Sequence, residues 1–354
     1  MRPFRIPQLD LSGDSARLVV VDREPGQYLG HVTTARLGDG RTLLAAYPTG
    51  HGEGGIVLKA SPDGGRIWGA RRPVPDNWAT SREVPTIHRV PDPRTGGHRL
   101  LLFSGLHPAR LASSDDEGAT WTPLAPIGTW GGIVVMASVL VRRDGSLLAF
   151  FHDDGRFVAG GGTATGTFTV YQVGSRDGGR TWEAPRAIWQ GDALHLCEPG
   201  VVRAPDGRGV ALLLRENRRR GESHVMVTTD EGASWSAPQP LARELTGDRH
   251  VVAADADGRL VVTFRDMAEG SPTKGDWVAW VGRWDDLRQA TPGQYRVRLG
   301  DNTDAWDSAY AGLERLDDGT FVATTYGHWA RGAPPYIVST RFTLRELDAR
   351  LAAR

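Results

Sequence analysis

Side chains that could take part in catalysis occur in short polar segments beside apolar runs of this 354-residue chain. Glu198 and the segment 307–310 each precede an apolar run, whereas His152 and Arg215 each follow one. Carboxylate, imidazole, guanidinium and phenol groups can act as acids, bases or nucleophiles when they line one concave pocket. Because these residues are far apart in the sequence, only the fold can bring them together.

The apolar runs are joined in pairs by tight turns. Five pairs enclose an Asp-Gly dipeptide, and a sixth, looser pair encloses Gly-Gly. An Asp-Gly turn between two apolar runs is a strong signal for a β-hairpin. The sequence therefore predicts six hairpins. Their turns are Asp39-Gly40, Gly96-Gly97, Asp144-Gly145, Asp206-Gly207, Asp257-Gly258 and Asp318-Gly319.

A second repeat, S-x-D-x-G-x-x-W, follows four of the six hairpins. Its aspartate can accept hydrogen bonds from nearby backbone N–H groups, its glycine suits a positive φ, and its tryptophan can pack between strands. Together the two repeats predict an all-β fold, a six-bladed β-propeller with four strands in each blade. The four copies of this tryptophan turn are Ser61–Trp68, Ser114–Trp121, Ser175–Trp182 and Thr228–Trp235, the last with threonine in place of serine.

Both ends of the chain are expected to close the ring. A strand near residues 16–22 would pair with the last blade, which we expect to end at 336–342. Closure from both ends removes exposed sheet edges. Apolar positions at helical spacing over 344–354 predict a short C-terminal helix. We therefore expect one domain, residues 1–354, with blades from about 28 to 342.

Composition limits the class of partner. Lys plus Arg and Asp plus Glu number 42 each, so the formal net charge is zero, and nucleic acid is not expected as a partner. No apolar stretch approaches the roughly 20 residues that span a bilayer, so no membrane partner is expected. The single cysteine, Cys197, and the absence of a signal-peptide core in residues 1–10 favour the cytoplasm, although removal of a leader would leave the same sequence. Nothing in the sequence indicates the oligomeric state.

Propeller geometry predicts that the polar segments meet on one face. The innermost strand of a blade and the next strand run antiparallel, so the start of the first and the end of the second lie together near the channel. Loops on a rigid scaffold usually carry function, and this face is the candidate site. The segments are 28–31, 82–83, 130–132, 198, 248–250 and 307–310 before innermost strands, and 47–53, 104–107, 152–156, 215–217, 265–266 and 326–329 after second strands.

These repeats and segments resemble the sialidase (neuraminidase) superfamily over about residues 28–342, where the tryptophan turn is called the Asp box. Sialidases use a tyrosine nucleophile with a glutamate partner, three arginines that bind the substrate carboxylate, and an aspartate acid/base. The resemblance implies that Tyr310 is the nucleophile, Glu198 its partner and Arg215 the second arginine. Physical chemistry agrees, because a phenol with a pKa of about 10 needs a neighbouring carboxylate to accept its proton.

The chain departs from the family pattern at the other two arginines. Its Phe-Arg-Ile-Pro motif, residues 4–7, comes too early to precede the first innermost strand, and His31 occupies the expected place of the first arginine. The neighbourhood of the third arginine, 274–277, contains none. Arg265 or Arg249 would have to compensate as substrate-binding residues.

The acid/base also differs from the family pattern. It belongs in the glycine-rich loop after the second strand of the first blade, where the chain offers Glu53 or His51. We assign proton donation to Glu53 and substrate binding to His51. Other substrate-binding candidates share this face, and Asp153 or Asp154 could also serve as a general acid. These candidates are His152, Asp153, Asp154, Arg156, Glu83 and His328. The histidine spacing is not specific for a metal, and we expect neither a metal nor a cofactor.

Three functions fit these residues. The first is an exo-acting glycoside hydrolase of sialidase type, which removes a terminal acidic sugar, either sialic acid or a related ulosonic or uronic acid, from a glycan. The second is a polysaccharide lyase, or another carbohydrate-active enzyme, that uses histidine and tyrosine on the same face as base and acid. The third is a propeller that binds glycans without catalysis, and the retention of both Tyr310 and Glu198 argues against it.

Overall fold

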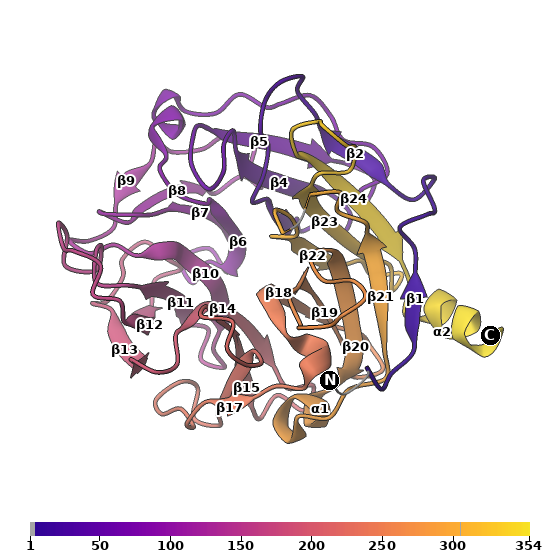
Figure 1. Ribbon diagram of the computed structural model, residues 1–354. Coiled ribbons are helices and arrows are strands. Elements are labelled where there is room, and N and C mark those ends of the chain that lie inside the picture. The colour runs from indigo at the N-terminus through magenta and orange to yellow at the C-terminus, as the bar shows by residue number, and fades with distance from the viewer. Residues whose placement is uncertain (1–3, 305) are drawn as a thin grey trace.

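Six β-sheets surround a central axis in the computed structural model, which describes residues 4–304 and 306–354 (Figure 1). The prediction of an all-β, six-bladed propeller is confirmed. Residues 1–3 and 305 of the expected domain 1–354 lie outside the described residues.

The first three blades follow the order of the chain, each from its innermost strand outward. Blade one has only three strands, one fewer than predicted: β3 Thr33–Arg36, β4 Leu43–Pro48 and β5 Ile56–Ser61. Blade two contains β6 Thr86–Pro91, β7 His98–Ser104, β8 Arg110–Ser114 and β9 Ala125–Pro126. Blade three contains β10 Ile133–Val141, β11 Leu147–Asp153, β12 Phe168–Ser175 and β13 Arg186–Gly191.

The remaining blades complete the ring. Blade four contains β14 Leu196–Arg203, β15 Val210–Glu216, β16 His224–Thr228 and β17 Gln239–Pro240. Blade five contains β18 Gly247–Ala254, β19 Arg259–Asp266, β20 Trp277–Arg283 and β21 Tyr295–Gly300, with β1 Gln8–Asp10 as a fifth strand parallel to β21. Blade six contains β22 Gly312–Arg315, β23 Phe321–Gly327 and β24 Tyr336–Phe342, and β2 Val19–Asp22 is its outer strand.

The two ends of the chain close the ring as the sequence predicts. Strand β2 pairs antiparallel with β24, so segments from the two ends share blade six (Figure 1). The C-terminal helix α2 spans Leu344–Ala352, and the side chain of Thr343 caps its first turn by accepting a hydrogen bond from the backbone N–H of Glu346 at 3.2 Å. The other α-helix, α1 Trp284–Gln289, follows β20, and two 3₁₀ helices span Asp76–Thr80 and Arg243–Leu245. Within the described residues, no helix is long and apolar enough to cross a membrane.

The tryptophan turns lie on outer connections, away from the channel. In blade two, Ser114 donates to Asp116 at 2.7 Å, and Asp116 accepts from the backbone N–H of Thr120 at 2.9 Å. Hydrogen bonds from Thr120 and Ser114 lower the pKa of Asp116 to about 2. Gly118 takes a φ of 79° to close the turn. Trp121 then packs edge-on against Trp78, with ring centroids 5.3 Å apart, so the turn stabilises the blade rather than the site.

Apolar contacts between neighbouring blades make the scaffold. The buried apolar residues of the described chain form six clusters, and each lies at one interface between adjacent blades. Leu44 of β4, for example, belongs to the same cluster as Leu100 and Leu102 of β7. Because the ring of interfaces is closed, the strand ends around the channel are held by packing from both sides.

Candidate active site

Innermost strands carry a backbone irregularity where they enter the candidate face. The pairing register shifts between Cys197 and Gly200 in β14, and between Asp248 and Val251 in β18. Such a bulge redirects side chains out of the strand alternation. Residues with positive φ occupy this position in five blades. They are His31 (53°), Val134 (49°) and Met136 (53°), Glu198 (53°), Arg249 (54°) and Ala309 (63°).

A positive φ at a residue other than glycine is uncommon and costs on the order of 1–3 kcal/mol. Two of these residues, Glu198 and Arg249, occupy equivalent positions in adjacent blades and interact electrostatically. Strain of this kind persists only where the surrounding structure imposes it, and it concentrates at functional sites. The strained position therefore marks the start of the innermost strands as the candidate site.

The structure brings Tyr310, Glu198 and Arg215 together. The hydroxyl of Tyr310 donates a hydrogen bond to Oε1 of Glu198. Arg215 Nη1 donates to the same carboxylate oxygen at 2.9 Å and to the Tyr310 hydroxyl at 3.1 Å. Tyr310 and Glu198 are only 7% and 5% exposed. The three groups form a compact hydrogen-bonded unit at the channel mouth.

Electrostatics set the protonation of this unit. Burial and the charge of Glu198 raise the pKa of Tyr310 well above its ordinary value. The pKa of Glu198 is lowered despite its burial, chiefly because Arg215 stabilises the carboxylate. Its second oxygen, Oε2, is buried and has no hydrogen-bond partner in the described chain. At rest, a neutral phenol therefore faces an ionised carboxylate that can accept a proton.

Asp248 contacts three arginines, one of which, Arg215, belongs to the hydrogen-bonded unit. Its carboxylate is fully buried and lies 3.1 Å from Nε of Arg215, 2.7 Å from Nη2 of Arg219 and 2.8 Å from Nε of Arg265. Charges of Arg265, Arg215 and Arg219 hold the pKa of Asp248 well below its usual range, although burial opposes this. The guanidinium carbon of Arg265 also lies 5.3 Å from the centre of the Tyr310 ring. Asp248 thus fixes the positions of the arginines relative to the phenol.

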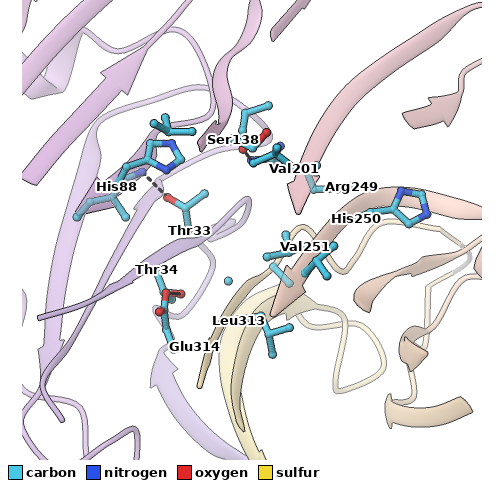
Figure 2. A pocket seen from close by; sticks show the side chains of 17 residues that line it. Thr33, Thr34, His88, Ser138, Val201, Arg249, His250, Val251, Leu313 and Glu314 are labelled. Atoms are coloured by element: carbon cyan, nitrogen blue, oxygen red, sulfur yellow. Dashed lines mark hydrogen bonds between the residues drawn. The ribbon is translucent and has the colours of Figure 1, made fainter. Parts of the chain in front are cut away.

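Arg249 belongs to the wall of the central channel. Its side chain is 3% exposed and donates to the carbonyl of Ala137 at 2.9 Å. It lines a cavity of about 170 Å³, which His88 and His250 also border (Figure 2). Burial lowers the pKa of Arg249, and the charge of Glu198 opposes that change. Arg249 therefore interacts with Glu198 and Tyr310 through its charge.

A second hydrogen-bonded group surrounds Asp307. Tyr28 and Tyr326 donate to Oδ1 of Asp307 at 2.9 and 3.0 Å. His51 Nδ1 lies 3.3 Å from the same oxygen, and His328 Nε2 lies 3.3 Å from Oδ2. These hydrogen bonds hold the pKa of Asp307 well below its usual range, even though burial opposes this. The structure thus places the predicted residues His51 and His328 on one carboxylate.

His31 connects the two groups. Its ring centroid is 4.7 Å from that of Tyr310 and 4.7 Å from that of His51. Its Nδ1 accepts a hydrogen bond from the backbone N–H of Gly52 at 3.2 Å. Burial lowers the pKa of His31 well below its ordinary value, so this ring is neutral. His31 therefore places an uncharged aromatic ring at the position expected for the first arginine.

Other predicted residues lie farther from the unit or are occupied by local bonds. The backbone N–H of Glu198 donates to His152 Nδ1 at 3.4 Å, and burial lowers the pKa of His152 to about 4. Asp153 accepts from the backbone N–H groups of three loop residues, Gly155, Phe157 and Val158, at 2.9 to 3.2 Å. Asp154 pairs with Arg156 at 2.8 Å. Glu53 is exposed, and its carboxylate has no hydrogen bond among the described residues.

Comparison with known proteins agrees with this geometry. A family model for the BNR repeat-like domain matches residues 41–269, more than half of the chain. The chain belongs to the BNR repeat-like domain family. A sialidase from Micromonospora viridifaciens is 29% identical over 269 residues, which are 65% of this chain and 38% of that sialidase. The resemblance to the sialidase superfamily is confirmed at the level of this domain and its fold.

Solved structures share the propeller of this BNR repeat-like chain. An α-L-arabinofuranosidase from Fusarium graminearum superposes with a TM-score of 0.70 at 13% identity, covering 93% of this chain and 98% of that chain. An intramolecular trans-sialidase from Ruminococcus gnavus gives a TM-score of 0.61 at 15% identity, covering 90% and 95%. At such low identity the likeness shows the fold alone.

Arg219 was missed in the sequence, and Asp248 was placed on the candidate face only as part of segment 248–250. Both carry ordinary surface residue types, and only the fold shows that they meet. Asp307 was seen only as part of the nucleophile segment, not as the partner of two histidines and two tyrosines. Within the described part of this BNR repeat-like domain, no group of three or more His, Cys, Asp or Glu side chains could hold a metal ion.

Glu83 gives the folded protein a specific pH dependence. Burial raises the pKa of Glu83 to about 7, although backbone N–H groups of Val84 and Val134 donate to its carboxylate. In the unfolded chain a glutamate ionises near pH 4.3. Between these values the folded protein keeps a proton that the unfolded chain has lost. The contribution of Glu83 to the free energy of unfolding should therefore fall as the pH rises from about 4.5 to about 7, whereas buried histidines with a lowered pKa, such as His152, contribute with the opposite sign.

The variant Glu83→Gln should remove on the order of 3 kcal/mol of this pH dependence, because each unit of pKa difference corresponds to about 1.4 kcal/mol. Urea unfolding at several pH values between 4.5 and 8 measures the slope. Burial also raises the pKa of Glu314 to about 7, so the double variant with Glu314→Gln should remove a second contribution of the same sign. An unchanged slope in Glu83→Gln would show that Glu83 ionises normally in the folded state.

Proposed function

We propose that this protein is a glycoside hydrolase in which Tyr310 attacks the anomeric carbon of a terminal sugar. The observation that carries the proposal is the unit in which the Tyr310 hydroxyl donates to Glu198 while Arg215 contacts both groups. A buried phenol paired with an ionised carboxylate is the arrangement that a tyrosine nucleophile needs. The sialidase from Micromonospora viridifaciens, 29% identical over the matched segment, adds support for the class of reaction.

In the first step, a bond forms between Oη of Tyr310 and the anomeric carbon as the glycosidic C–O bond breaks. The raised pKa of Tyr310 disfavours a free phenolate, so its proton passes to Glu198 as the new bond forms. The leaving oxygen takes a proton from an acid elsewhere in the site. In the second step, water releases the sugar from Tyr310, and Glu198 returns the proton to the phenol. Arg215 keeps the two oxygens in contact throughout.

The charge of the site supports an acidic sugar as substrate. Four arginines, residues 215, 219, 249 and 265, lie around Tyr310, and the ionised carboxylates of the same site are Glu198, Asp248 and Asp307. The excess of positive charge would attract a carboxylate. Of the four, Arg215 and Arg219 are the most exposed, with side-chain fractions of 16% and 34%, so they are the ones a substrate carboxylate can reach. We propose exo-cleavage of a terminal sialic, ulosonic or uronic acid.

A panel of fluorogenic glycosides tests the proposal. It should contain aryl glycosides of sialic acid, another ulosonic acid and a uronic acid. An aryl arabinofuranoside, which is uncharged, tests whether the site prefers a neutral sugar. We expect release of the fluorophore from at least one acidic glycoside, and at least tenfold higher kcat/KM for it than for the arabinofuranoside. Preference for the neutral sugar would overturn the substrate class, and no turnover of any glycoside would overturn hydrolysis.

One observation favours a lyase as the second candidate. A base and an acid that act on a uronic acid could be His51 and Tyr28, whose Nδ1 and hydroxyl lie 2.7 Å apart beside the channel mouth. Elimination would leave an unsaturated sugar that absorbs ultraviolet light, whereas hydrolysis would not. Absorbance measurements on uronic acid polymers therefore separate the two reactions.

A further inference from the structure

The loop between β4 and β5 carries His51 into the pocket in a fixed position. A backbone hydrogen bond from Thr49 N–H to the Gly55 carbonyl, at 3.1 Å, closes the loop. Gly52 takes a φ of 68°, which favours glycine, and its N–H donates to His31. The loop is thus tied to the wall of the site at its tip, directly beside His51.

The imidazole of His51 is held on one nitrogen and open on the other. Nδ1 lies 2.7 Å from the hydroxyl of Tyr28 and 3.3 Å from Asp307. Because Tyr28 donates its proton to Asp307 at 2.9 Å, its oxygen is left to accept from Nδ1–H of His51. This assigns the proton to Nδ1 by the hydrogen-bond network and leaves Nε2 as the free nitrogen. The side chain of His51 is 53% exposed, so Nε2 can meet a ligand.

We propose that His51 is the acid and base of the hydrolysis, and that Asp307 and Tyr28 are its positioning residues. The inference rests on the proposed function, because it supplies the proton that the leaving oxygen needs. A carboxylate that binds one ring nitrogen fixes the tautomer and stabilises the imidazolium, as in hydrolases with an aspartate–histidine pair. The pair His51–Asp307 has this arrangement on the open side of the site.

The position of His51 relative to Tyr310 suits this role. The ring of His31 packs against both, with its centroid 4.7 Å from that of His51 and 4.7 Å from that of Tyr310. In glycosidases that form a covalent intermediate, the nucleophile and the acid flank the scissile bond. Trp306, which is 54% exposed, lies edge-on to His51 at 6.4 Å and supplies an apolar wall at the same rim. A sugar in contact with Tyr310 would therefore present its leaving oxygen toward His51.

Glu53, the proton donor expected from the sequence, lacks such support. It lies two positions farther along the same loop, is exposed, and has no hydrogen bond to its carboxylate within the described structure. A general acid acts efficiently only when it is held within hydrogen-bond reach of the proton that moves. The contacts therefore favour His51 over Glu53, although the role of Glu53 stays a prediction.

The proton balance of the reaction closes with His51. Protonated His51 gives its Nε2 proton to the leaving oxygen as that oxygen departs, and becomes neutral. Neutral His51 then takes a proton from the water molecule that attacks the sugar bound to Tyr310, and the imidazolium is restored. Glu198 exchanges its proton only with Tyr310. The Tyr310–Glu198 pair and the His51–Asp307 pair therefore do not compete for a proton.

A series of leaving groups tests His51 directly. The variant His51→Asn should lower kcat/KM by about 10² to 10⁴ for glycosides with a basic alkoxide leaving group, which needs a proton. It should lower kcat/KM less than tenfold for an aryl glycoside whose acidic phenol leaves unaided. The matched control is His98→Asn, because His98 is an exposed histidine on the opposite face. In this variant kcat/KM should depend on the leaving group as it does in the wild type. Activity on the aryl glycoside also shows that the variant is folded.

The same series decides between the candidates. If Glu53→Gln steepens the dependence on the leaving group and His51→Asn does not, the proposal is wrong. Asp307→Asn tests the positioning role, since loss of the carboxylate removes one of the groups that hold the imidazole of His51. It should lower kcat for glycosides with a basic alkoxide leaving group about tenfold more than for the aryl glycoside, with KM nearly unchanged. Equal loss on both kinds of glycoside would exclude the pairing.

Failure of this inference can be told apart from failure of the proposed function. If Tyr310→Phe abolishes turnover while kcat/KM of His51→Asn depends on the leaving group as in the wild type, only the assignment of His51 is overturned. If Tyr310→Phe remains fully active, the hydrolytic mechanism itself is wrong, whatever the result for His51.

Discussion

Replacing Tyr310 by phenylalanine should lower kcat by at least about a thousandfold on the best glycoside of the panel. The substitution removes the oxygen that attacks the sugar and leaves the ring, so packing against Arg265 and His31 is preserved. Loss of a nucleophile costs about 10³-fold or more, because the other groups of the unit cannot replace it. Initial rates with purified variant and wild type measure the effect.

The matched control is Tyr295→Phe. Tyr295 lies on the outer strand β21, and its hydroxyl donates to Asp348 at 2.9 Å, outside the site. Its loss should lower stability by about 1 kcal/mol and leave kcat within twofold of the wild type. Retention of more than a tenth of wild-type kcat by Tyr310→Phe would remove Tyr310 from the role of nucleophile.

Replacing Asp248 by asparagine should lower the free energy of unfolding by about 3–5 kcal/mol. The carboxylate is fully buried and compensates Arg215, Arg219 and Arg265, so its loss leaves three like charges around one neutral side chain. The same change should release Arg215 from its position between Glu198 and Tyr310. We therefore expect turnover to fall together with stability, even at temperatures at which the variant remains folded.

Urea unfolding measures the loss of stability, and activity is assayed where circular dichroism shows native structure. Asp317→Asn is the control. Asp317 pairs with Arg36 at 2.7 Å on the opposite face, but its side chain is 82% exposed. An exposed ion pair contributes little, so this variant should change stability by less than about 1 kcal/mol. Equal effects of the two substitutions would contradict the role of Asp248 as the centre of the arginine cluster.

The fold could be predicted because its turns have specific chemistry. Asp-Gly dipeptides mark the hairpins, and the tryptophan turns mark the outer connections, so the two repeats together set the phase of every blade. That phase placed Tyr310, Glu198 and Arg215 at strand ends on one face, where the structure shows them in contact. Turn residues act locally, and a pattern in the sequence can therefore reveal them.

The remaining features depend on contacts between distant segments. Glu198 and Arg249 adopt a positive φ. A sequence indicates a positive φ only where it contains glycine, so these two positions could not be recognised. Asp248 of blade five meets Arg215 and Arg219 of blade four, and Asp307 of blade six meets His51 of blade one. Strand β1 adds to blade five through only three residues, which show no strand pattern of their own. Each of these depends on tertiary packing, so no local rule could predict it.

The central claim is that Tyr310 forms a covalent bond with the sugar. A fluorinated analogue of the preferred acidic sugar, activated at its anomeric carbon, would form this intermediate and slow its hydrolysis. Peptide mass spectrometry after brief incubation then locates the adduct. The account predicts the mass of one fluorinated sugar on the peptide that contains Tyr310, and no adduct in Tyr310→Phe. An adduct on Glu198 or on any other residue would contradict it.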